Sequence, residues 1–203
     1  MLALSIGGLT AGFSPRSVGR QEHFVPRLEP ILEKLALAQH RLLRTADSVP
    51  ADQWQASRGN ATWSAAQVVA HLIMVERTVI GNADCLLQKT PKHFSLLKKF
   101  HLPLALVESR VIRRKTPIPI DPQLIREKET MLAELREVRE RTLAFLEETK
   151  GRDLSVYCWP HPFLGTFNVY GWFQMIAAHE VRHEKQMREI VASLPKAIET
   201  LQK

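Results

Sequence analysis

Two histidines near the C-terminus stand four residues apart in the sequence HEVRH, from His179 to His183. On a helix, side chains at positions i and i+4 project from the same face, so both imidazoles can reach one metal ion. The pattern also matches the H-E-x-x-H motif of zinc proteases, whose glutamate is the general base. A third interpretation is that the two histidines are hydrogen-bonded core residues without a ligand.

The protease interpretation fits poorly with the residues that follow. The extended protease motif needs a glycine and a third histidine downstream, but Gln186 and Glu189 stand at those positions. No histidine follows His183, and no strand pattern supplies the sheet edge on which such enzymes hold a peptide. We therefore expect Glu180 to face solvent or to hydrogen-bond a ligand histidine, rather than to act as a protease base.

A third histidine, His71, lies on the apolar face of another segment with helical periodicity. If the two helices pack together, His71, His179 and His183 can form a three-nitrogen site. Such a site leaves a coordination position open to water or substrate, as in catalytic zinc sites. Nickel, iron or cobalt would also accept imidazole ligands. Three buried imidazoles without a partner would be costly, and a divalent metal ion removes that cost.

Four segments have the three-and-four spacing of apolar residues that predicts amphipathic helices. They span about residues 30–49, 64–89, 121–151 and 169–193, and no convincing strand alternates between them. Their N-termini carry typical start signals, namely Pro30, the S-x-x-Q capping box of Ser64 and Gln67, Asp121 followed by Pro122, and Asn168. The sequence therefore predicts an all-α fold, a four-helix bundle over residues 25–195. Residues 1–24 are expected to be a poorly ordered extension, and residues 196–203 a tail.

The link between the second and third predicted helices, residues 89–120, is long and basic. It holds eight Lys or Arg and one acidic residue, a surplus equal to the net charge of +7 of the whole chain. We expect short helices in it near Phe94–Lys99 and Leu104–Arg114. Nucleic-acid binding is not favoured, because Phe94 and Phe100 are its only aromatic residues for stacking on bases. A solvated crossover, or a lid that attracts an anionic substrate, fits this segment better.

The cellular compartment is suggested by two features. No apolar run approaches the roughly 18 residues of a membrane span. Cys85 and Cys158 are the only cysteines, too few for a disulfide framework in 203 residues. We therefore expect a cytoplasmic protein with reduced thiols. The N-terminal apolar stretch lacks a basic region before it, so a signal peptide is only a minor alternative.

Two stretches of the chain resemble signatures of the DinB-like (YfiT-type) superfamily. WSAAQVVAHL, from Trp63 to Leu72, is similar to its helix 2 signature. HPFLGTFN, from His161 to Asn168, and AAHEVRHEKQM, from Ala177 to Met187, are together similar to its C-terminal signature. The resemblance implies a four-helix bundle with a long crossover between helices 2 and 3. It also implies a divalent metal (zinc, nickel or iron) bound by three histidines, at His71, His179 and His183.

The resemblance further implies an activity class without naming a substrate. Members of the superfamily include metal-dependent hydrolases and transferases or isomerases that use a low-molecular-weight thiol, and members are often homodimers. The implied function is a metal-dependent enzyme acting on a small molecule. The alternative is a non-catalytic, ligand-binding or regulatory helical bundle. The catalytic residues and the thiol, if one is used, are not identified by the sequence.

Three side chains on the last predicted helix are candidates for the surroundings of the metal. Trp172 and Met175 precede His179 on nearly the same helix face, so they either line a pocket or belong to the core. Gln186 lies seven residues after His179 and could hydrogen-bond a ligand histidine.

Two candidates lie outside that helix. Glu76 follows His71 by five residues, which turns it away from that face; it either orients a ligand histidine or faces solvent, and we favour solvent. His161 stands in the loop before the last helix. It either reaches the mouth of the pocket or has a structural role in a turn beside Pro162.

Overall fold

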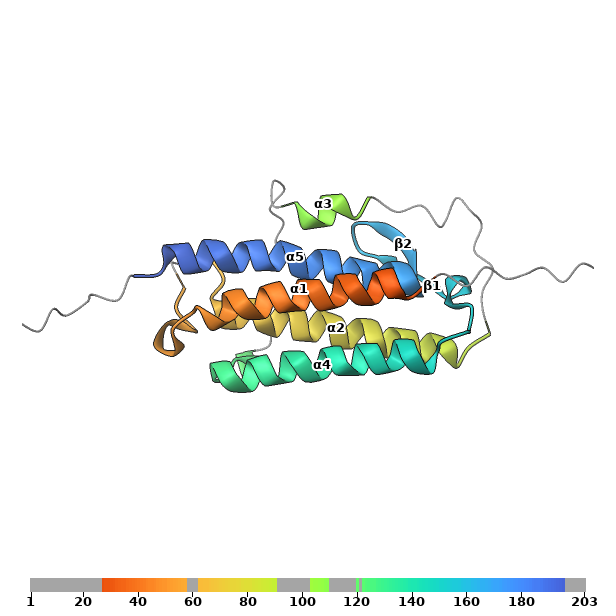
Figure 1. The fold of residues 1–203 in the computed structure, drawn as a ribbon, viewed down its shortest axis with the longest axis horizontal. Coiled ribbons are helices and arrows are strands. Elements are labelled where there is room, and N and C mark those ends of the chain that lie inside the picture. The colour runs from red at the N-terminus through yellow and green to blue at the C-terminus, as the bar shows by residue number, and fades with distance from the viewer. Residues whose placement is uncertain (1–26, 58–61, 91–102, 110–119, 121, 196–203) are drawn as a thin grey trace, which may run out of the picture.

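The computed structural model describes residues 27–57, 62–90, 103–109, 120 and 122–195, and the observations below concern these residues. The predicted terminal segments 1–24 and 196–203 lie outside them. The fold is mostly helical, as the sequence predicts. Four long helices lie side by side (Figure 1), namely α1 (Glu29–Asp47), α2 (Ala65–Leu87), α4 (Lys128–Glu148) and α5 (Val169–Ser193).

The long helices share one apolar core. Helix α5 packs along α1 and against α2, and α2 packs against α4. Between α1 and α4, the Gln39 side chain donates a hydrogen bond to the carbonyl oxygen of Leu135, at 3.2 Å. The largest fully buried side chains include Trp54, Phe167 and Phe173. Burial of this apolar surface holds the two histidine-bearing helices, α2 and α5, against each other.

Side-chain caps fix where α2 and α5 begin. The predicted capping box is confirmed: Ser64 Oγ accepts from the backbone N–H of Gln67 at 3.2 Å, and Gln67 Oε1 accepts from the backbone N–H of Ser64 at 2.9 Å. Asn168 Oδ1 accepts from the backbone N–H of Gly171 at 2.8 Å and starts α5, also as predicted. These bonds satisfy N–H groups that the first turn of a helix leaves without a partner.

Helix α4 begins later than the sequence predicts. Residues Pro122–Leu124 form a separate 3-10 turn, η3, and the backbone is extended at Glu127 before α4 begins at Lys128. Leu124 in this turn and Ile125 just after it pack their side chains against the core from outside the helix. Both residues continue the apolar spacing of α4 although they lie before its first residue, which is why the predicted helix began too early. The predicted cap, Asp121, lies outside the described residues.

A short antiparallel hairpin precedes α5, although no strand pattern is evident in the sequence. Strand β1 (Cys158–His161) pairs with β2 (Gly165–Asn168), with Trp159 opposite Phe167 and His161 opposite Gly165. Gly165 adopts a φ of +96°, which favours glycine, at the turn of the hairpin. Strands of four residues are too short to show an alternating pattern, which explains why this element was missed.

Part of the basic crossover lies on α5. Its helix α3 (Ala105–Glu108) falls within the predicted segment Leu104–Arg114, whereas the predicted helix at Phe94–Lys99 lies outside the described residues. Lys185 Nζ donates to the carbonyl oxygen of Glu108 at 2.9 Å, and Arg182 donates to the carbonyl oxygen of Ser109. Two cations of α5 thus bind the C-terminal end of α3, where helix carbonyls lack intrahelical partners.

Two remaining short elements are the 3-10 turns η1 (Ala51–Gln53) and η4 (Leu154–Val156). Neither cysteine forms a disulfide: Cys158 is buried, whereas Cys85 is exposed on α2. In the part of the chain that the structure describes, no helix combines the length and apolar character needed to cross a membrane.

The capping box predicts the effect of Ser64→Ala. Loss of the serine hydroxyl leaves the N–H of Gln67 without its partner, so the free energy of unfolding should fall by about 1 kcal/mol. Urea denaturation in the presence of a chelator measures this. The control is Thr78→Ala, which alters an exposed hydroxyl in the middle of α2 and should change stability by less than about 0.5 kcal/mol. An equal effect of both variants would contradict the assignment.

Candidate metal site

Three histidine rings from two helices converge on one point. His71 projects from α2, and His179 and His183 project from successive turns of α5. The Nε2 atom of His179 lies 3.3 Å from that of His71 and 3.1 Å from that of His183. A ligating nitrogen of each ring lies within 4.8 Å of the other two. His71 and His183 are buried, and His179 is half-buried.

Burial keeps the rings of His71 and His179 neutral. It lowers the pKa of His71 to about 4. Burial also lowers the pKa of His179 well below its usual value, and the positive charges that His183 and His71 can carry lower it further. A neutral imidazole has a lone pair for a metal ion, whereas a protonated one has none. His71 and His179 are therefore held in the protonation state that binds metal.

Gln186 orients one of the three rings. Its Oε1 atom lies 2.9 Å from Nδ1 of His183. An amide oxygen only accepts, so Nδ1 carries the proton and the lone pair of His183 is on Nε2, which faces the cluster. His71 Nδ1 is buried without a hydrogen-bond partner among the described residues, so no such contact fixes that ring.

The arrangement fits a divalent metal ion better than a set of hydrogen bonds. A single ring nitrogen offers one proton or one lone pair, so Nε2 of His179 cannot make a full hydrogen bond to both neighbours. Two imidazole nitrogens about 2.05 Å from a tetrahedral zinc ion are about 3.3 Å apart. The two observed separations are close to this value. Among the described residues, no fourth His, Cys, Asp or Glu joins the group, which leaves a coordination position for a non-protein ligand.

Trp63 covers the cluster, a position that helical periodicity does not predict. Its ring stacks on that of His183, with centroids 5.9 Å apart and an angle of 7° between the planes. It also lies 5.0 Å from the ring of His71. Trp63 precedes the N-cap of α2, so helical periodicity could not place it on a face. Its position next to Ser64 in the stretch WSAAQVVAHL was the available signal.

The hairpin brings a fourth histidine near the cluster. The ring of His161 lies 5.3 Å from that of Trp172, which stacks on Trp159 at 4.8 Å and donates to its carbonyl oxygen at 3.2 Å. Burial lowers the pKa of His161, and the charge that His161 can carry contributes to the lowered pKa of His179. Trp172 thus attaches the hairpin to α5, and His161 lies within electrostatic range of the cluster. Met175 is buried in the core.

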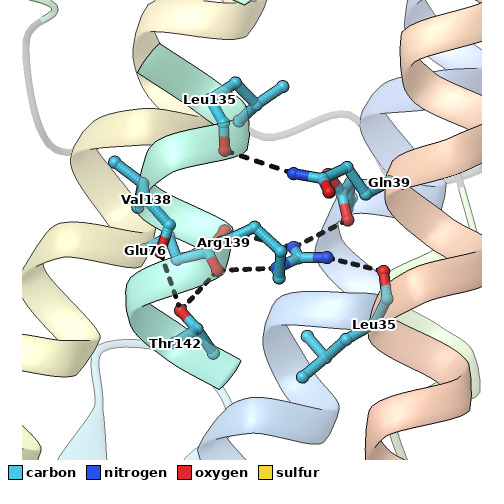
Figure 2. Close-up of polar contacts among 8 residues, drawn as sticks. Leu35, Gln39, Glu76, Leu135, Val138, Arg139 and Thr142 are labelled. Carbon is cyan, nitrogen blue, oxygen red and sulfur yellow. Dashed lines mark hydrogen bonds and ion pairs between the residues drawn. The ribbon is translucent and has the colours of Figure 1, made fainter. Parts of the chain in front are cut away.

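The structure corrects the expectation that Glu76 faces solvent. Glu76 is 3% exposed, and its carboxylate forms two bonds with Arg139 of α4, from Nε to Oε1 at 2.8 Å and from Nη2 to Oε2 at 3.1 Å (Figure 2). Thr142 Oγ1 also donates to Oε1, at 2.6 Å. The physical reason is that Arg139 is itself buried and draws the carboxylate inward. Arg139 lies four residues after Leu135, on the spacing of the apolar stripe, which was the signal for its burial.

Glu180 is also buried, with 1% exposure, and accepts from Arg139 Nη2 at 2.9 Å. The prediction that Glu180 could face solvent is therefore wrong. Burial raises the pKa of Glu180 to about 7, although the charge of Arg139 opposes this shift, and Glu76 adds to it. Burial would lower the pKa of Arg139, but the charges of Glu180 and Glu76 raise it above its ordinary value. Because this carboxylate is bound to Arg139 in the core, it is not placed as the base of a protease.

Comparison with known proteins identifies the family. The profile described as the DinB superfamily matches residues 34–187, a range that includes the three histidines and Trp63. The chain belongs to the DinB superfamily. This confirms the resemblance that its two sequence signatures indicated.

A further DinB-like relative is the Bacillus subtilis (strain 168) protein YuaE, which is described as uncharacterized. It is 30% identical over 137 residues, which cover 66% of this chain and 81% of YuaE. No solved structure gives a significant match.

In this DinB superfamily member, Gln186 should influence metal affinity through His183. Gln186→Met removes the acceptor for Nδ1–H, so the ring is no longer held in the required tautomer, and zinc affinity should fall about tenfold. Competition with a chromophoric chelator measures this. Gln186→Glu keeps an acceptor oxygen and should retain or increase affinity. A fall of the same size in both variants would show that the hydrogen bond to His183 is not the cause.

Proposed function

We propose that this DinB superfamily member is a metal-dependent enzyme that binds one divalent metal ion, zinc, nickel or iron, through His71, His179 and His183. The single observation that carries the proposal is the convergence of three Nε2 atoms from two helices, at separations that suit one cation. The proposal includes the four-helix bundle with a long crossover that is typical of the superfamily, and a small-molecule substrate at the open coordination position.

A divalent cation at this point would supply Lewis acidity, which favours deprotonation of a coordinated water or thiol and polarises a carbonyl group. The protein contributes the surroundings. Gln186 holds His183 in its ligating tautomer, and Trp63 covers the rings of His71 and His183 and excludes water from that side. These contacts would help to hold the ligands in place.

His161 is the residue that we propose for proton transfer during the reaction. The backbone N–H of Phe163 donates to Nδ1 of His161 at 3.1 Å, so the neutral ring carries its proton on Nε2. Burial favours this neutral form by lowering the pKa of His161. An N–H donor within electrostatic range of the three histidines is suited to hydrogen-bond a bound substrate.

Two reaction classes remain within the proposal: hydrolysis, and transfer of a group to a low-molecular-weight thiol. Metal-loaded protein can be screened against esters, amides and electrophiles such as epoxides, each with and without thiol. Turnover without thiol indicates a hydrolase, and turnover only with thiol indicates a transferase. Turnover by His179→Ala at the wild-type rate would sink the metal-dependent mechanism. Metal binding without any turnover would favour the alternative, a ligand-binding or regulatory bundle.

The assembly and location of the protein form a separate part of the proposal. We propose a homodimer in the cytoplasm, and neither Cys85 nor Cys158 forms a disulfide within the chain. Light scattering of purified protein distinguishes a dimer of about 46 kDa from the 23.1 kDa chain, the larger value being twice the mass of one chain.

The metal site predicts a clear result from elemental analysis. Tag-free protein dialysed against Zn²⁺ or Ni²⁺ should contain about one metal ion per chain, since the three nitrogens form one site. His71→Ala, His179→Ala and His183→Ala should each lose most of this metal. The control is His40→Ala, which changes an exposed histidine on α1 and should retain it. If wild-type protein takes up no metal, the proposal is wrong and the histidines are core residues.

A further inference from the structure

The guanidinium of Arg139 contacts all four long helices. It projects from α4, forms two bonds with Glu76 on α2, and donates to Glu180 on α5. Its Nη1 atom donates to the carbonyl oxygen of Leu35 on α1, at 2.5 Å. Figure 2 shows the side chain of Arg139 extending from α4 between Glu76 and the backbone of Leu35. One side chain is therefore the common hydrogen-bond donor to the three other long helices.

Stability alone does not explain this network. Arg139, Glu76 and Glu180 are 2%, 3% and 1% exposed, so all three lose most of their hydration. Apolar side chains of similar volume often give equal or greater stability at such positions. A network of charged hydrogen bonds differs from apolar packing in its directionality. The paired contacts between the guanidinium and Glu76 fix an angle as well as a distance.

The two carboxylates stand close to the histidines along their helices. Glu180 directly follows His179 on α5, and Glu76 follows His71 by five residues, about 7.5 Å along α2. The separation of His179 and His183 is set within one helix. The distance of His71 from these two residues is not set within a helix. It depends on how α2 is placed and rotated relative to α5.

We infer that Arg139 is a positioning residue for the metal site: by binding Glu76 and Glu180 together, it fixes the rotation of α2 relative to α5 and so the distance of His71 from the other two ligands. The inference rests on the proposed function. A 10° rotation of a helix moves side-chain atoms about 1 Å, since they lie roughly 6 Å from its axis. Metal–ligand distances tolerate only about 0.2 Å.

The test is Co²⁺ binding by the full-length Arg139→Met protein. Circular dichroism first shows that the variant is folded, and Co²⁺ affinity and visible absorption are then measured. Affinity should fall about tenfold or more. The absorption spectrum should shift toward that of His71→Ala, because His71 is the ligand that loses its position. Glu76→Gln, which preserves shape and removes one charge, should change both readouts in the same direction and provides a second variant if Arg139→Met does not fold.

The control is Leu146→Ala, which removes buried apolar volume from α4 about two turns beyond Arg139. It should lower thermal stability but leave Co²⁺ affinity and the spectrum as in wild type. Wild-type affinity and spectrum in folded Arg139→Met and Glu76→Gln would overturn the inference and leave the metal site standing. An equal loss of affinity in Leu146→Ala would also overturn it, since loss of stability would then explain the effect. Absence of Co²⁺ binding by the wild type would overturn the metal site, and the inference with it.

Discussion

A buried arginine with two buried carboxylates constrains the whole arrangement of helices. Arg139 and Glu180 must stay paired, because separating them would leave a charge in the core without a partner. Glu76 is held by both Arg139 and Thr142. Apolar packing between the long helices would tolerate small slides and rotations, whereas these bonds do not. The helices are therefore held in one relative placement.

The histidine site combines two kinds of constraint. Within α5, helical geometry alone places His179 and His183 on one face. Between α2 and α5, the position of His71 depends on tertiary packing, on the caps that start each helix, and on the carboxylates that meet Arg139. Local helix geometry therefore sets the distance between His179 and His183. Long-range contacts set the distance of His71 from both. Desolvation completes the site, since it keeps the rings of His71 and His179 neutral and able to bind a cation.

The sequence predicted the parts of this molecule that depend on local rules. Apolar spacing and cap residues located α1, α2 and α5, and the same spacing selected the three histidines that converge. Periodicity was less reliable where the chain leaves a helix without losing its apolar residues, as at Leu124 and Ile125 before α4. The hairpin was missed because its strands are short, and Trp63 because it precedes its helix.

The buried charges could not be predicted in this way. Glu76 and Glu180 look like surface residues in isolation. The spacing of Arg139 along α4 indicates burial, but only the mutual contacts of the three side chains make that burial tolerable. Such pairing joins residues from three helices that are distant in the sequence, so no single segment contains the signal. For the same reason, the glutamate of HEVRH matched a protease motif while its carboxylate is committed to a different partner.

The order of the helices along the chain has a consequence for biosynthesis. His71 and His179 are 108 residues apart, and α5 is the last of the long helices to leave the ribosome. Arg139 can meet Glu76 while α5 is still being made, so α2 and α4 can pair first. Both remaining ligands arrive together on α5. Assembly of the proposed three-histidine site is thus postponed until α5 docks against α2.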